Sequence, residues 1–131
     1  MKLATLTSIP SHKSYGQDYY LWVVEQVSLL QSSQLQDLDL VNLVSELEDI
    51  GKREKRSVKN NLVVLLINLL KYQFQSEYQS SSWLTTIIEH RLRLRDNFED
   101  SPSLQSYAAN PSVLKRCYEV ACDRASHEIG L

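Results

Sequence analysis

Residues 62–70, "LVVLLINLL", constrain the fold of this chain more than any other segment. Only Asn68 is polar among these nine residues, so a helix formed here is apolar on nearly every side. Such a helix must be covered by other parts of a protein, and nine residues are too few to cross a bilayer, which takes about 20. We therefore predict that residues 58–70 form the central helix of a bundle.

The rest of the sequence also predicts helices. No segment alternates apolar and polar residues over the length of a strand, and the chain has only three Gly and three Pro. Its 131 residues suit one domain with a core of its own. We predict an all-α, single-domain bundle of five or six helices over residues 1–131, in which residues 1–14 form a loosely ordered N-terminal arm.

Local start and stop signals predict the helix boundaries. Asp39 is a good N-cap, and Gly51 is expected to end the helix that Asp39 begins. Asn110 with Pro111 predicts the start of the last helix, and Gly130 predicts its end. The resulting helices cover residues 16–32, 39–51, 52–74, 83–98 and 110–130, with a short helical turn before the last one.

The two cysteines and the N-terminal segment indicate the cellular compartment that we expect for this chain. Cys117 and Cys122 lie five residues apart on one predicted helix, which puts their Cα atoms about 8 Å apart, too far for a disulfide. No His or Cys partner completes a zinc pattern. The N-terminal apolar run is too short for a signal peptide. We expect a soluble, cytoplasmic chain without a membrane segment, a metal or a cofactor.

The charge pattern gives little reason to expect nucleic-acid binding. The net charge is −2, so no overall basic field attracts anionic polymers. The run 52–59 contains five basic residues, but Glu54 interrupts it and its positions wrap around the predicted helix. We interpret this run as a solvated, charge-paired face, and a phosphate-binding patch is the alternative.

Arg91 raises a specific question, because it lies among the apolar residues of the fourth predicted helix. A guanidinium there must either extend outward or meet an acceptor. The second predicted helix offers a polar stripe that includes Asn42 and Glu46, and Glu46 is the carboxylate expected to face inward. Our hypothesis is a Glu46–Arg91 pair that Asn42 also hydrogen-bonds. Such a pair either fixes helix register or forms an anion-binding or acid/base site.

Asn68 extends this candidate polar cluster. Asn61, Asn68 and Gln75 recur every seven residues on the central helix. They form either an exposed edge, the lining of a groove, or a polar line that faces Arg91. The candidate polar cluster is therefore Asn42, Glu46, Asn68 and Arg91.

Aromatic residues supply a second candidate site. The first predicted helix has two apolar stripes, one of them formed by Tyr20, Val23, Val24, Val27 and Leu30, the other by Tyr15, Trp22 and Leu29. Two stripes indicate two packing partners. Together with aromatic residues near the turn before the fourth helix, they suit core packing, which is the favoured use, or a partner surface. The candidate partner surface is Tyr15, Trp22, Tyr78 and Trp83.

Several blocks in order, "YGQDYYLWVVEQVSLLQ", "LDLVNLVSELEDIG", "LLKYQFQSEYQSSSWLTTI", "SPSL" and "HEIGL", make the chain similar to the bacterial domain of unknown function 29 family over nearly its whole length. The resemblance implies a single all-helical domain and no established activity. It favours polar residues at Asp18, Glu25, Gln26, Asp39, Asn42, Glu46, Glu48, Lys71, Gln75 and Arg91. This chain departs from the pattern with Asn68 in place of His, Ser45 before Glu46 in place of paired acids, and Ser76 in place of Pro. The lost His weakens a metal or acid/base interpretation.

Three functions remain open at this point. The leading hypothesis is an interaction module that binds a protein partner or itself through the aromatic stripe of the first helix and residues 72–83. The alternative is a small-ligand-binding or enzymatic domain that uses the candidate polar cluster. Nucleic-acid binding through residues 52–59 is the second alternative. No HExxH motif or Gly-rich loop supports an enzyme, so we assign no catalytic residue.

Overall fold

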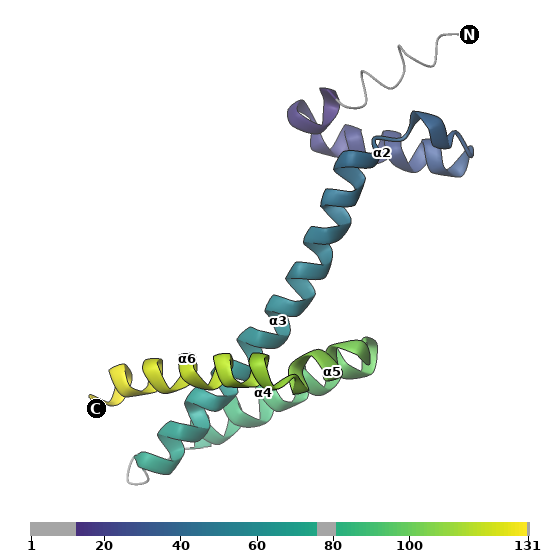
Figure 1. Ribbon diagram of the computed structural model, residues 1–131. Helices are drawn as coiled ribbons and strands as arrows, with labels where there is room; N and C mark the ends of the chain where they lie inside the picture. The colour runs from purple at the N-terminus through teal and green to yellow at the C-terminus, as the bar shows by residue number, and fades with distance from the viewer. Residues whose placement is uncertain (1–12, 76–80, 131) are drawn as a thin grey trace. The chain divides into compact units, whose positions relative to one another are not determined.

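The computed structural model describes residues 13–75 and 81–130 (Figure 1). No strand occurs among these residues, and the predicted all-α fold is confirmed. Residues 13–17 are helical, so positions 13 and 14 belong to a helix and not to the predicted arm, whose other residues lie outside the described part. The elements that follow are α2 (Tyr19–Gln31), the 3-10 helix η1 (Leu35–Asp37), α3 (Leu40–Phe74), α4 (Ser81–Asp100), α5 (Ser103–Ala109) and α6 (Pro111–Ile129).

The chain divides into two compact units, Met1–Gly51 and Lys52–Leu131. The first unit contains α2, η1 and the start of α3. The second contains the rest of α3 together with α4, α5 and α6. That the whole chain folds as one domain stays a prediction.

In the first unit, α2 begins at an acidic cap. The Asp18 side chain accepts a hydrogen bond from the backbone N–H of Leu21 at 3.0 Å, which satisfies a donor that the first turn leaves free. The helix buries Trp22, Gln26 and Leu29, spaced at i, i+4 and i+7 on one face. Trp22 and Leu29 come from one predicted apolar stripe, so that stripe faces the interior of the first unit.

The helix α3 continues through Gly51, and the prediction that a helix ends there is wrong. Gly in a helix interior costs only about 1 kcal/mol relative to Ala, and the neighbouring residues favour the helix. Glu48 lies four residues before Lys52, and Asp49 lies four before Arg53, which is the favourable order for acid and base along a helix. A single Gly without a following Pro therefore does not stop α3.

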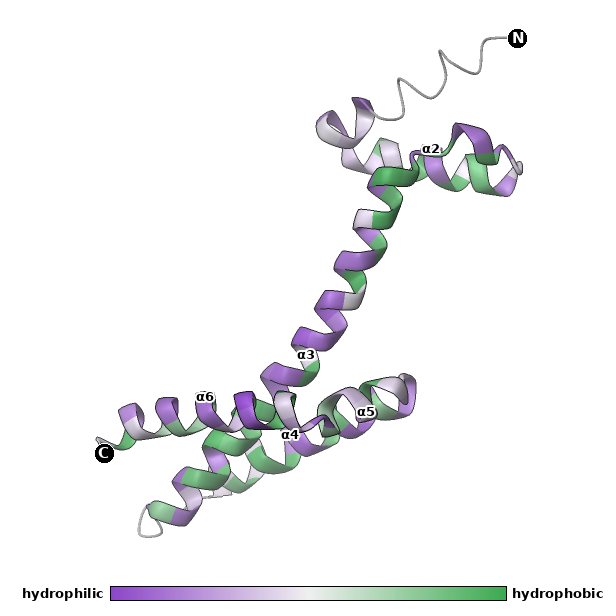
Figure 2. Ribbon diagram, viewed as in Figure 1, coloured by the Kyte–Doolittle hydropathy of each residue, from purple (hydrophilic) through white to green (hydrophobic). Residues whose placement is uncertain are grey.

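The second unit is built around the C-terminal part of α3, as predicted. Val63 and Ile67 of α3 pack against three small residues of α6, Cys117, Ala121 and Ala125. A second buried cluster joins α3 to α4 and α5 through Val58, Leu94 and Ala108. Figure 2 shows apolar residues replacing the polar ones along α3 where these helices surround it.

The boundaries of α6 also match the prediction. The Asn110 side chain accepts a hydrogen bond from the backbone N–H of Ser112 at 2.9 Å, and Pro111 occupies the first turn. Gly130 follows the helix with φ 77°, a left-handed conformation that costs Gly little. Within residues 13–75 and 81–130, no helix combines the length and the apolar character needed to span a bilayer.

Candidate functional site

A buried polar network in the first unit surrounds Asp39, the residue before α3. Its Oδ2 accepts hydrogen bonds from the indole Nε1 of Trp22 at 2.9 Å and from Nδ2 of Asn42 at 2.7 Å. The side-chain oxygen of Gln26 accepts from the backbone N–H of Asp39 at 2.8 Å. Trp22, Gln26 and Asp39 are each only 2% exposed. Asp39 therefore caps α3 and also ties it to α2.

Glu46 forms a second polar contact about two turns after Asp39, on α3. Its Oε2 accepts a hydrogen bond from the Tyr15 hydroxyl at 2.6 Å, and its Oε1 accepts from the Tyr19 hydroxyl. The hydrogen bond to Glu46 raises the pKa of Tyr15 to about 12, and desolvation and the negative charge of Glu46 add to the effect. Tyr15 therefore stays a protonated donor at neutral pH, and Glu46 is held as the acceptor of both hydroxyls in the first unit.

The candidate polar cluster draws on both units. Asn42 and Glu46 belong to the first unit, where Asn42 is bound by Asp39 and Glu46 by the two tyrosines. Asn68 and Arg91 belong to the second unit. The Glu46–Arg91 pair stays a prediction. Sequence patterns missed the tyrosine contacts of Glu46, because Tyr15 lies 31 residues before it.

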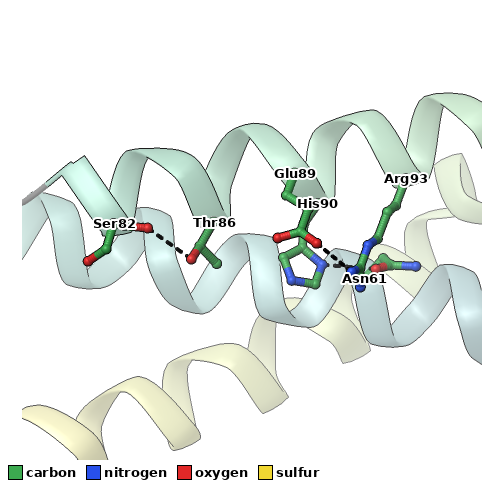
Figure 3. A network of polar contacts seen from close by, with 6 residues as sticks. All are labelled: Asn61, Ser82, Thr86, Glu89, His90 and Arg93. Carbon is green, nitrogen blue, oxygen red and sulfur yellow. Dashed lines mark hydrogen bonds and ion pairs between the residues drawn. The ribbon is translucent and has the colours of Figure 1, made fainter.

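The polar line on α3 meets α4 at His90, not at Arg91. Asn61 donates from Nδ2 to the Ser57 carbonyl at 3.0 Å, which turns its Oδ1 toward Nδ1 of His90 at 2.9 Å (Figure 3). An amide oxygen can only accept, so Nδ1 of His90 carries the proton in this contact. Asn68 donates to the Val64 carbonyl at 2.8 Å, so its amide group is satisfied partly by its own helix.

Arg91 lies on the outer arc of α4. Ile87 and Leu94 are the buried residues of this helix, whereas Arg91 itself is exposed together with Ile88 and Leu92. The apolar residues of α4 thus form two arcs, one inside the second unit and one on its surface. The sequence left two possibilities for Arg91, an outward side chain or an inward one that meets an acceptor. Within the second unit, the side chain of Arg91 is exposed, as in the first possibility.

A groove of about 590 Å³ runs beside Arg91, entirely within the second unit. The buried Leu94 and the half-buried Leu65 and Phe98 contribute its apolar lining. Its lining also includes charged and polar groups from α4 and α5, namely Arg91, Arg95, Glu99 and Gln105. The groove can therefore offer apolar contact and cationic donors to the same ligand.

The residues of the candidate partner surface differ in exposure. Trp22 is buried and bound to Asp39, so it belongs to the interior of the first unit and not to its surface. Tyr15 is half-buried, with its ring 4.7 Å from that of Trp22. Trp83 is half-buried in the second unit, where Nζ of Lys71 lies 5.5 Å from the centre of its ring. Tyr78 lies outside the described residues.

The first unit exposes apolar residues that the aromatic prediction did not include. On α2, Tyr20 is 77% exposed, and Val24 and Val27 follow it at one-turn spacing. On α3, the exposed residues Leu40, Val44 and Leu47 repeat the same spacing. We call these six residues the first-unit apolar surface. The spacing of apolar residues identified the stripe that contains Tyr20, Val24 and Val27, but it could not show which of the two stripes of α2 faces outward.

The basic run and the cysteines show no ligand geometry. The basic residues of 52–59 are exposed, and Nζ of Lys55 lies 5.0 Å from the centre of the Tyr107 ring. Cys117 and Cys122 are both free, and burial raises the pKa of the Cys117 thiol, with the nearby Lys59 opposing the shift. Among the described residues, no group of three or more His, Cys, Asp or Glu could hold a metal ion.

Comparison with known proteins gives one match. The family described as Domain of unknown function DUF29 matches residues 14–131. The chain belongs to this family. No curated protein and no solved structure matches the chain. The match confirms the resemblance that the sequence blocks indicated.

The DUF29 resemblance emphasised polar positions, and several of them occupy defined places in the first unit. Asp18 caps α2, and Gln26, Asp39 and Asn42 form the buried network at the start of α3. These contacts hold helix ends and join helices. A structural role accounts for these four positions without any reaction.

Proposed function

We propose that the chain is a cytoplasmic interaction module that self-associates through the first-unit apolar surface. The observation that carries the proposal is the imbalance between buried and exposed apolar residues in this unit. Of its described residues, Trp22 and Leu29 are the buried hydrophobic ones, whereas twelve large hydrophobic residues are exposed. Exposed apolar residues at one-turn spacing on both α2 and α3 are candidates for coverage by a partner, because large exposed apolar patches on soluble proteins commonly mark interaction sites.

A second copy of the chain is the partner that we favour. In a twofold-symmetric contact, one surface serves both copies, so a single set of exposed residues is covered on each. Specific interfaces bury about 800 Å² on each partner and use roughly 20–30 residues a side. The six residues of the first-unit apolar surface would form the apolar centre of such a contact, and the polar residues around them would form its rim.

Light scattering coupled to size-exclusion chromatography tests this proposal. We expect a wild-type mass of twice the monomer value of 15.1 kDa. The double substitution Val24→Glu and Val44→Glu places charges in the apolar surface on both helices and should give a monomer with unchanged helix content by circular dichroism. Leu114→Glu is the matched control, because Leu114 is similarly exposed but lies on α6 in the second unit. A wild-type chain that stays monomeric at high concentration would refute self-association.

A further inference from the structure

The exposed arc of α4 combines apolar and cationic residues. Leu84, Ile88 and Leu92 are 46%, 54% and 47% exposed and are spaced four residues apart. Arg91 and Arg95 share this arc and line the groove of the second unit. At 100° per residue, all five positions fall within about a quarter of the helix circumference. One side of α4 therefore presents an apolar stripe with two guanidinium groups one turn apart.

These two guanidinium groups differ from their neighbour Arg93 in their partners. Arg93 is paired with Glu89 four residues earlier on the same helix (Figure 3). Among the described residues of the second unit, neither Arg91 nor Arg95 has an ion-pair or side-chain hydrogen-bond partner. Two unpaired cations beside apolar side chains favour a ligand that is itself both anionic and apolar.

We propose that this groove binds an amphipathic helix of a partner protein that carries acidic residues beside its apolar stripe. The exposed Ile88 and Leu92 and the half-buried Phe98 would contact the apolar stripe of the bound helix, and Arg91 and Arg95 would each pair with a carboxylate. Acidic residues three or four positions apart on a helix are about 5–6 Å apart, which matches two arginines at i and i+4. The lining residues of α4 extend from Ile88 to Glu99, about 17 Å of helix.

The other groups of the groove narrow the choice of ligand. A single carboxylate, as on a fatty acid, would leave one of the two guanidinium groups without a partner, whereas an acidic helix engages both. Glu99 lies at one end of the lined segment and repels acidic groups there. The bound helix therefore has its acidic residues near Arg91 and Arg95 and a neutral or basic residue near Glu99. This proposal concerns the second unit and does not depend on self-association of the first.

Fluorescence anisotropy with two synthetic peptides tests the proposal on the full chain. Both peptides have about 16 residues, enough to favour a helix on binding, and the same leucine stripe, flanked by Glu in one peptide and by Lys in the other. We expect the Glu peptide to bind at micromolar concentrations and the Lys peptide to bind at least about tenfold more weakly. The Arg91→Glu, Arg95→Glu variant should reverse this preference. Equal binding of the two peptides, or no binding of the Glu peptide at about 1 mM, would overturn the proposal.

Two further variants test whether peptide binding depends on the charges and the apolar contacts of this groove. Arg93→Glu makes the same charge change on the same helix outside the groove, and it should change the affinity for the Glu peptide less than about threefold. Ile88→Asp should weaken binding of both peptides, because it removes apolar contact at an exposed position. If Arg93→Glu weakens binding as much as the double variant, the groove is not the binding site. The oligomeric mass of the double variant should equal that of the wild type, which distinguishes this site from the self-association surface.

Discussion

The substitution Asp39→Ala should destabilise the first unit strongly. Asp39 is 2% exposed, accepts from Trp22 and Asn42, and precedes α3 as its cap. Alanine removes all of these acceptors. The Trp22 indole is also buried, so its N–H has no water to replace the lost carboxylate.

The size of the effect follows from these contacts. Leaving the buried Trp22 donor without an acceptor costs about 1–3 kcal/mol. Losing the cap of α3 costs about 0.5–2 kcal/mol. Because both losses arise in one network and do not add fully, we expect the free energy of unfolding to fall by about 2–4 kcal/mol. Asn42 is half-buried and can bind water in place of Asp39, so the loss of its hydrogen bond adds less to the destabilisation.

Urea denaturation followed by tryptophan fluorescence measures this loss. The chain has two tryptophans, so Trp83→Phe leaves Trp22 as the reporter of the first unit. Asp39→Ala is compared with Glu48→Ala in this background, because Glu48 is an exposed acid of the same helix. If Asp39→Ala lowers the free energy of unfolding by less than about 1 kcal/mol, or no more than Glu48→Ala does, the network does not stabilise the fold as argued.

Two further predictions concern titratable groups. Tyr15 has its pKa raised from 10.0 to about 12 in the folded state, so its contribution to stability is fully present below about pH 10 and is lost as the pH rises toward 12. Between about pH 10 and 12, the melting temperature of the Tyr15→Phe variant should therefore fall less than that of the wild type, and an equal fall would argue against the Glu46 contact. Cys117 is buried with a raised pKa, so a thiol reagent at neutral pH should modify Cys122 first. Cys122→Ser should remove the fast phase of that reaction, and a fast phase that persists would show that Cys117 is accessible.

The sequence predicted those parts of the fold that depend on local signals. The caps at Asp39 and Asn110 and the end at Gly130 each involve groups within four residues of one another. The central position of residues 58–70 followed from a helix with apolar residues on nearly every side, which must be covered. Such features need no knowledge of which helix is the neighbour.

Gly51 shows where a local signal is too weak. A helix-ending Gly and a mid-helix Gly are identical in sequence, and only the residues on both sides distinguish them. The acidic residues before Gly51 and the basic residues after it support each other across it at i and i+4. This pairing outweighs the small cost of one Gly, so α3 continues through position 51.

Arg91 and Trp22 show what periodicity alone cannot resolve. The apolar residues of α4 cover an arc wide enough to include a buried edge and an exposed edge, and Arg91 lies on the exposed one. Trp22 needs an acceptor for its N–H once it is buried, and that acceptor lies 17 residues away. Contacts at such separations depend on the fold, so the sequence indicated the residues but not their partners.

The contact between α3 and α6 has a consequence for how this protein tolerates sequence change. The buried residues of α6 are Cys117, Ala121 and Ala125, whose side chains extend little beyond the backbone. A larger residue there would have to displace the residues of α3 packed against it or move α6 outward. Natural variation should therefore be narrow along this strip of small side chains and broad on the outward side of the same helix.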